Sequence, residues 1–495
     1  MTRLPWHPLL ITACYLVFNV ADTGVDPLAA GRAFLVALGF TALLQVAASV
    51  ALRDGERGAT LATAILLLAI FWVPIAGIAD GYGRLPAVEA AVLAILVAAA
   101  LILAARLVLR RGGFGGAPTG FLNAFSVALA VVVGAAALTA PGWAAGSSSS
   151  PRPADVPRAS DAPDIFVLLV DGHPRPDSLL EQTGHDIGPF VDALMDVGFD
   201  VAPEARSNYR WTGASLYSIL EMTLAASSAP EIASGGAGAP EIRSALADNA
   251  AFHTLRAHGY RVTAIGPPYE HVALRSADEF IDGGYLNSFE CHLIRRTVVG
   301  PLAWAVSPSL VGDPRRGGVT QSLDEARAIA AAESEQPRFV WVHLPVPHIP
   351  VLWDAEGRAV DIAHGSDCAP QGIPVPDAAD MRAAYHASLD HADGLVLEAI
   401  RDILTSASEP PVILLLSDHG GHLVGSAPDH RQPVHWRDSF AAFLAVHAPG
   451  EERPLPDDVS LANVLPSLFN AYLGAGIPLV DDRTFATDGT EAPEP

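Results

Sequence analysis

The sequence contains no lysine, so its 30 basic residues are all arginine, and they face 54 acidic residues. The net charge of −24 is unevenly spread, with +2 on residues 1–150 and −26 on residues 151–495. Binding to a nucleic-acid backbone requires clustered basic residues, which such an acidic excess opposes. We therefore expect no nucleic-acid partner. An anionic substrate would have to be held by a local device such as a metal ion.

Cysteine is also scarce, with three residues in the chain. Cys14 lies in an apolar stretch, which leaves Cys291 and Cys368 as the pair available in an oxidising compartment. Such a compartment permits a disulfide, and the sequence leaves open whether these two residues form one.

The first 150 residues contain few charges and five apolar stretches. These stretches cover residues 7–22, 33–52, 59–79, 86–109 and 120–141. The last four are long enough to cross a bilayer as helices, which takes roughly 20 residues each. The first is shorter and could be a signal peptide, but no small-residue cleavage site follows it. We therefore predict an all-α transmembrane domain of about five helices over residues 1–141.

Arginine positions predict how this domain is oriented. Six arginines fall on one side of the predicted spans (Arg3, Arg53, Arg57, Arg106, Arg110 and Arg111) and two on the other (Arg32 and Arg84). The positive-inside rule then places the N-terminus in the cytoplasm and everything after about residue 142 outside. The spans hold almost no ionisable residues, which favours anchoring over transport. We expect a multi-pass protein of the inner or plasma membrane.

Residues 142–163 are predicted to form a flexible linker rich in serine and proline, and residues 164–495 are predicted to form an extracytoplasmic domain. Apolar strands alternate there with helical stretches, a pattern typical of a mainly parallel sheet covered by helices. The predicted strands are 165–170, 261–265, 339–343, 412–417 and 440–447. The predicted helices are 189–197, 242–258, 323–332, 381–404 and 461–473, and residues 224–240 are predicted to be a loop.

One predicted strand, Val412–Ser417, ends abruptly on Asp418, His419 and two glycines. In open α/β sheets, chemistry collects where parallel strands end at their carboxyl edge. The Asp-His pair is therefore a candidate metal or phosphate site, although an ordinary strand-to-loop turn has the same pattern.

The first outer strand ends in the same way, on Asp171. Two carboxylates and one imidazole could then converge, unless Asp171 only caps the turn that follows it. Aspartate oxygens with one histidine suit a divalent ion. We expect one such ion, with Mn²⁺ as first choice and Zn²⁺ or Mg²⁺ as alternatives.

A helix is predicted to begin at Thr212, within Ser-Asn-Tyr-Arg-Trp-Thr-Gly. The N–H groups and dipole at a helix N-terminus favour an anion, and a neighbouring metal ion would activate the threonine hydroxyl as a nucleophile. The alternative is that Thr212 is only an N-cap.

A further strand, Phe339–His343, runs into a loop in which prolines stand close on both sides of His348. Proline stiffens such a loop and presents the imidazole, which favours substrate contact for His348, although a structural role is the alternative. The role of His343 is left open. One of His422, His430 and His435 could also approach the site.

Together these motifs resemble the alkaline phosphatase/sulfatase superfamily over about residues 163–485. The resemblance is strongest to its membrane-anchored sulfatase-like branch, which includes lipoteichoic acid synthases and phosphoethanolamine transferases. It rests on Asp171-Gly, on the segment ending at Thr212, on His343-Leu-Pro-Val-Pro-His348 and on Asp418-His419-Gly, in that order. It implies an alkaline phosphatase-like α/β fold.

The resemblance also implies roles for individual residues. Asp171, Thr212, Asp418 and His419 would hold the metal, Thr212 would take up the phosphoryl group, and His343 and His348 would lie at the substrate. The expected enzyme is a metal-dependent phosphoryl transferase or phosphodiester hydrolase acting on a membrane-lipid or envelope-glycan head group. Arylsulfatases that use formylglycine carry a Cys or Ser in a Cys-x-Pro-x-Arg context where this chain has Thr212. A phosphoryl substrate is therefore favoured, and a sulfatase is the alternative. A catalytically silent envelope binding protein is another.

Overall fold

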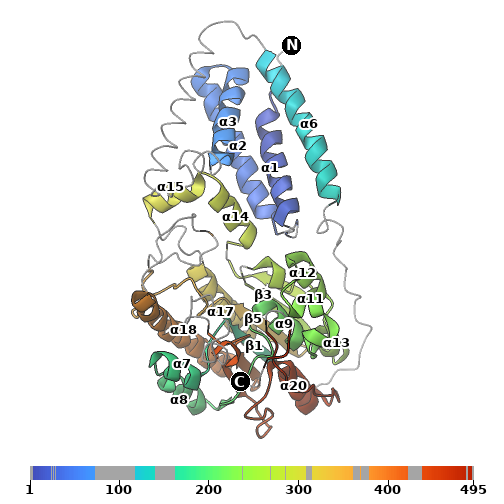
Figure 1. The fold of residues 1–495 in the computed structure, drawn as a ribbon, viewed down its shortest axis with the longest axis vertical. Coiled ribbons are helices and arrows are strands. Elements are labelled where there is room, and N and C mark those ends of the chain that lie inside the picture. The colour runs from blue at the N-terminus through green and yellow to red at the C-terminus, as the bar shows by residue number, and fades with distance from the viewer. Residues whose placement is uncertain are drawn as a thin grey trace. The chain divides into compact units, whose positions relative to one another are not determined.

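The computed structural model describes residues 4–72, 117–139, 162–307, 315–360, 378–421 and 438–492, apart from isolated positions within these ranges, and Cys368. The chain divides into two compact units (Figure 1). Unit 1 comprises Met1–Ser148, Asn287–Asp313 and Ala363–Val375. Unit 2 comprises Ser149–Leu286, Pro314–Ile362 and Pro376–Pro495. Most of the predicted linker lies outside the described residues, so the domain boundaries at 141 and 163 stay predictions.

Unit 1 is helical in its described part. Its helices are α1 (His7–Thr23), α2 (Gly31–Leu52), α3 (Gly55–Ile70), α6 (Ala117–Thr139), α14 (Ser288–Arg296) and α15 (Val299–Val306). Two stretches, Gly31–Leu52 and Thr119–Ala137, are long and apolar enough to cross a membrane. The predicted five-helix domain is therefore not confirmed, and its stretch 86–109 lies outside the described residues.

The segment Asn287–Asp313 packs with the N-terminal helices, although it lies within residues 164–495, which were predicted to form the outer domain. The Arg32 guanidinium donates two hydrogen bonds to the Glu290 carboxylate, of 2.6 and 2.5 Å. Phe289 is buried in an apolar cluster with residues of α1, α2 and their connection. A disulfide joins Cys291 to Cys368, so the two later segments of unit 1 are covalently linked.

Unit 2 contains a seven-stranded sheet. Its strands are β1 (Ile165–Val170), β2 (Asp200–Val201), β3 (Arg261–Gly266), β4 (Glu279–Asp282), β5 (Arg338–Leu344), β6 (Val412–Leu416) and β7 (Leu444–His447), in the order β2-β7-β6-β1-β5-β3-β4. The neighbours from β6 to β4 run parallel, whereas β7 is antiparallel to both β6 and β2. The predicted mainly parallel sheet is confirmed, and the short strands β2 and β4 were missed.

Helices cover both faces of this sheet. Successive side chains of a strand point to opposite faces of the sheet, and in β1 the side chains on both faces are buried. Ile165, Val167 and Leu169 join one apolar cluster, while Phe166 and Leu168 join another. The first cluster includes helices α9 (Thr212–Glu221), α13 (Ala250–Ala257) and α20 (Val464–Leu473). The second includes α8 (Gly188–Asp196), α17 (Arg315–Ala331) and α18 (Ala378–Ser406).

One helix prediction and one loop prediction need correction. The predicted helix 242–258 is two helices, α12 (Ala239–Ala247) and α13, because the Asn249 side chain accepts the Phe252 N–H and starts a new helix. The predicted loop 224–240 contains the short helices α10 (Ala225–Ser228) and α11 (Pro230–Ala233). Remaining elements are α7 (Pro176–Thr183) and the 3-10 turns η1 (Glu270–Val272) and η2 (Leu461–Asn463).

Candidate metal centre

The candidate site lies at the carboxyl edge of the three central strands β6, β1 and β5 in unit 2. Asp171 follows β1 directly, and its N–H donates a hydrogen bond to the Leu344 carbonyl at the end of β5. Asp418 stands two residues beyond β6. Gly172 joins the two turns, because its N–H donates a 3.0 Å hydrogen bond to Asp418 Oδ1. Its φ of +69° is left-handed, a conformation that glycine adopts without strain.

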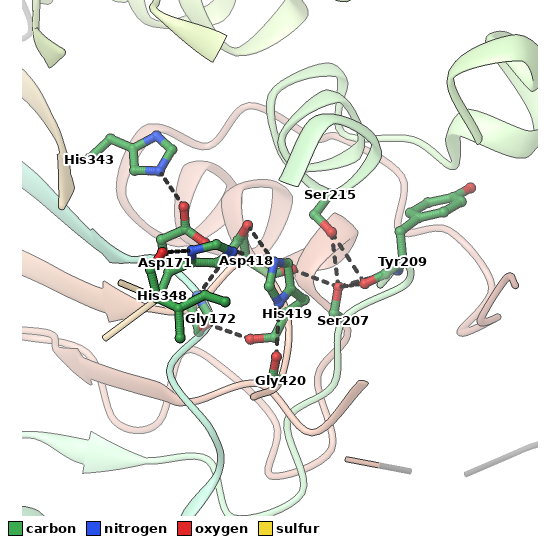
Figure 2. A network of polar contacts seen from close by, with 12 residues as sticks. Asp171, Gly172, Ser207, Tyr209, Ser215, His343, His348, Asp418, His419 and Gly420 are labelled. Carbon is green, nitrogen blue, oxygen red and sulfur yellow. Dashed lines mark hydrogen bonds and ion pairs between the residues drawn. The ribbon is translucent and has the colours of Figure 1, made fainter. Parts of the chain in front are cut away.

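Three side chains converge at this edge (Figure 2). One ligand atom from each of Asp171, Asp418 and His419 lies within 4.8 Å of the other two. His419 Nε2 is 3.3 Å from Asp418 Oδ2 and 3.8 Å from Asp171 Oδ1. Both of these carboxylate oxygens are buried and have no hydrogen-bond partner among the described residues. Buried oxygens without a donor are costly, and a cation between them would remove that cost.

The orientation of His419 suits metal binding. Its Nδ1–H donates a 2.8 Å hydrogen bond to the Gly420 carbonyl, so Nε2 faces the carboxylates. Ligating histidines are generally oriented in this way by a hydrogen bond from the other ring nitrogen. Two carboxylates and one imidazole are a donor set for Mn²⁺, Zn²⁺ or Mg²⁺, and the residues present therefore fit one divalent ion.

The two carboxylates have opposite pKa shifts. Burial raises the pKa of Asp171, but the imidazoles of His348, His343 and His419 outweigh it and hold that pKa below its ordinary value. Burial, and then the negative charge of Asp171, raise the pKa of Asp418. A divalent cation would offset both the burial and the mutual repulsion, because it is the largest local charge in such a site.

Both predicted histidines of the β5 region lie beside Asp171. His343 is fully buried, and its Nε2 lies 3.5 Å from Asp171 Oδ2. The His348 N–H donates a 3.0 Å hydrogen bond to the Asp171 carbonyl, and its Nδ1–H donates one of 2.7 Å to the Ile349 carbonyl. The loop thus fixes His348 at the site, while His343 supports Asp171 from within the strand.

Thr212 is the first residue of α9 and is half-buried, and the N-cap is Trp211, whose side chain makes no capping hydrogen bond. The alternative that Thr212 is an N-cap is therefore wrong. Hydrogen bonds connect α9 to the candidate metal centre through Ser207, Ser215 and Asp418 (Figure 2). Ser207 Oγ donates to the Asp418 carbonyl at 2.7 Å and lies 3.1 Å from Ser215 Oγ in the first turn of α9. Metal binding by Thr212 stays a prediction.

Ser207 is the residue that sequence reasoning missed. It is completely buried and contacts the backbone of Tyr209 as well as Asp418. The available signal was its place five residues before Thr212, but a serine in such a segment does not by itself indicate a distant partner. His422, His430 and His435 lie outside the described residues.

A model of the sulfatase family matches residues 222–474, just over half of the chain. The chain therefore belongs to the sulfatase family, and the resemblance to the alkaline phosphatase-like superfamily is confirmed. The matched part includes His343, His348, Asp418 and His419, whereas Asp171 and Thr212 precede it. The protein is thus an enzyme of the sulfatase-like hydrolase and transferase type.

Several solved structures are similar to this chain, and they come from proteins with different names. The C-terminal periplasmic domain of EcEptC from Escherichia coli is 16% identical, with a TM-score of 0.41, covering 65% of this chain and 86% of that one. The lipoteichoic acid synthase LtaP from Listeria monocytogenes is 14% identical (TM-score 0.39, coverage 67% and 76%). A putative sulfatase from Bacteroides thetaiotaomicron is 12% identical (TM-score 0.40, coverage 65% and 72%). No curated protein matches the sequence. Likenesses at this level do not assign an activity.

Proposed function

We propose that unit 2 is a metal-dependent phosphoryl transferase or phosphodiester hydrolase that acts on a membrane-lipid or envelope-glycan head group, with Thr212 as nucleophile. The observation that carries this proposal is the pair of buried oxygens on Asp171 and Asp418 that accept no hydrogen bond from the described residues and face His419 Nε2. When bound there, a divalent ion would polarise a phosphoryl oxygen and favour ionisation of a neighbouring hydroxyl.

The residues of the chain have distinct roles in this reaction. The Thr212 hydroxyl loses its proton to solvent, and Thr212 Oγ forms a bond to phosphorus while the bond to the leaving oxygen breaks. The leaving oxygen departs with the bonding electrons and takes up a proton from solvent, which leaves a phosphothreonine. The N-terminal N–H groups of α9 stabilise negative charge beside that atom. His348 Nε2 is the ring nitrogen left for the head group, because Nδ1–H is held by the Ile349 carbonyl. A water or an acceptor alcohol then attacks the phosphothreonine, and the Thr212 hydroxyl is restored.

A sulfate ester is the second candidate substrate, and membership of the sulfatase family favours it. We prefer the phosphoryl substrate because position 212 carries an unmodified threonine hydroxyl, outside a Cys-x-Pro-x-Arg context. A catalytically silent binding protein would have little use for two buried carboxylates that each keep one oxygen without a hydrogen bond, since such oxygens destabilise the fold unless a cation is bound.

We further propose that unit 1 is integral to the inner or plasma membrane, with the N-terminus in the cytoplasm and unit 2 outside. The two apolar helices and the six arginines on one side of the predicted spans support this placement. Of the six, Arg53 is the C-cap residue of α2 and Arg57 lies in the first turn of α3, so both are at the same end of these two helices. A lipid or envelope-glycan head group would then be available to unit 2 at the outer surface.

The catalytic proposal is tested on the full chain in detergent, stripped of metal and then supplied with Mn²⁺, Zn²⁺ or Mg²⁺. Turnover is measured on matched nitrophenyl phosphodiester, phosphomonoester and sulfate ester. We expect metal-dependent turnover that is highest on the phosphodiester. Thr212→Ala should lower kcat at least about 1,000-fold, because it removes the nucleophile.

Thr212→Ser is the matched control, since it keeps a hydroxyl and should retain measurable turnover. Phosphothreonine detected by mass spectrometry after rapid quenching would identify the intermediate directly. Faster turnover of the sulfate ester would select the sulfatase alternative. Absence of turnover on all three esters, together with absence of metal uptake, would contradict the enzymatic proposal.

A further inference from the structure

Unit 1 contains a cavity of about 670 Å³ among helices α1, α3 and α6. Its wall is mostly apolar and includes Ile11 and Phe18 of α1, Leu67 of α3 and Leu129 of α6. This volume lies within the range of about 300–1,000 Å³ typical of sites for small molecules. The lining residues on α1 and on α6 each extend over about two helical turns, so the cavity is elongated along the helices.

Among the described residues that line the cavity, Arg296 at the end of α14 is the one with a charged side chain. Its guanidinium Nη1 lies 3.5 Å from Asp22 Oδ2, a distance at which one carboxylate holds it weakly, and about half of its side chain is exposed. The remaining polar side chains of the wall are Tyr15 and Asn19 of α1. In the part of the chain that the structure describes, the cavity therefore combines a long apolar wall with one cation.

The segment that carries Arg296 is firmly attached to the other helices of unit 1. Its His292 Nε2 lies 3.1 Å from Asn19 Oδ1, within hydrogen-bond distance, and the Asn19 amide donates to the Tyr15 carbonyl. The Val298 N–H donates to the Ala69 carbonyl at the end of α3. Arg296 is thus held at the cavity by contacts on either side of it in the sequence.

We infer that this cavity binds an acyl chain of a lipid whose anionic head group pairs with Arg296. An acyl chain fits an elongated apolar wall. Helices that are apolar enough to cross a bilayer are surrounded there by lipid, which is therefore the most abundant apolar molecule near the cavity. Arginine is suited to phosphate, because its planar guanidinium can donate two parallel hydrogen bonds. The inference uses the proposed membrane placement of unit 1 but is independent of the proposed catalytic mechanism of unit 2.

The test measures lipid bound to the full chain in mixed micelles that contain phosphatidylglycerol and phosphatidylcholine in equal amounts. After purification, bound lipid is quantified by mass spectrometry. We expect phosphatidylglycerol to be retained several-fold over phosphatidylcholine. Arg296→Gln should remove this preference, whereas Arg295→Gln, which changes an arginine outside the cavity wall, should not. Leu129→Trp should reduce retention of both lipids by filling the cavity, and Val127→Trp on the exposed side of α6 is its control.

Cys14 provides a second measurement, because it lines the cavity and the other two cysteines form the disulfide. Bound phosphatidylglycerol should slow its reaction with N-ethylmaleimide in the wild-type chain and in Arg295→Gln, but much less in Arg296→Gln. Equal retention of the two lipids by the wild-type chain, or retention unchanged by both Arg296→Gln and Leu129→Trp, would overturn the inference. Turnover of the soluble phosphodiester should be the same in all four variants, so a failure here is distinct from a failure of the catalytic proposal.

Discussion

Asp438 is a buried acid next to the candidate metal centre. Burial raises its pKa to about 6, although Ser178 Oγ donates a 2.9 Å hydrogen bond to its carboxylate. An aspartate in the unfolded chain has a pKa of about 3.9. Between these two values the folded state binds more protons than the unfolded state, so the free energy of unfolding falls as the pH rises from about 4 to about 6.

We therefore predict that Asp438→Asn stabilises unit 2 at pH 7.5 and stabilises it about half as much at pH 5, because at pH 5 the unfolded chain is already ionised while the folded chain is mostly protonated. Asparagine keeps an acceptor for Ser178 and removes the buried charge, and a shift of two pKa units corresponds to at most about 3 kcal/mol. Thermal unfolding of the metal-free chain at the two pH values measures the effect. An equal change in Tm at both pH values would show that the charge of Asp438 is not responsible.

The turn after β6 positions two of the candidate metal-binding side chains as one element. It leads from the buried strand through Asp418 and His419 to Gly420, whose N–H donates to the Ser439 carbonyl. A Cβ on Gly420 would lie 1.7 Å from the Asp438 carbonyl oxygen, which belongs to the backbone. Glycine is required here because no side-chain rotation can relieve that contact.

We predict that Gly420→Ala lowers the affinity for the divalent ion at least about 10-fold, because the turn must shift and displace His419. Gly317→Ala in α17 is the control, since a Cβ there meets no neighbouring atom within 4 Å and alanine favours a helix. Competition with a chelator measures the affinity of each variant. Wild-type affinity in Gly420→Ala would mean that the turn accommodates a side chain.

Unit 1 combines segments that are distant in the sequence. Asn287–Asp313 and Ala363–Val375 belong with the N-terminal helices, and the disulfide between Cys291 and Cys368 connects residues 77 positions apart. A crosslink that closes a long loop stabilises chiefly by reducing the entropy of the unfolded chain, although the measured effect varies between proteins.

We predict that replacing both cysteines, as Cys291→Ser with Cys368→Ser, lowers the stability of unit 1 by about 2–4 kcal/mol. Turnover of a soluble ester should persist, because the candidate metal centre is built entirely from unit 2. Thermal unfolding with and without reductant measures the change. Reductant should lower the Tm of the wild-type chain toward that of the double variant and leave the variant itself unchanged, and a wild-type Tm insensitive to reductant would contradict the prediction.

The sequence by itself determined the central strands of unit 2 and the residues at their ends, but not the short strands β2 and β4. Continuous apolar runs such as Ile165–Val170 have to be buried on both faces of a sheet, and polar residues directly after them have to lie at its edge. Asp171, Asp418 and His419 could therefore be singled out before any contact was known. The start of α9 at Thr212 followed from the apolar spacing after it.

Only the tertiary structure decided which distant residues meet. It showed that β7 runs antiparallel, that His343 lies beside Asp171, that Ser207 links α9 to the Asp418 turn and that residues 287–313 join unit 1. The physical reason is that hydrophobic periodicity reports how each segment is buried. Strand direction, shared hydrogen bonds and the assignment of a segment to one unit or another depend on packing between parts of the chain that are far apart in sequence.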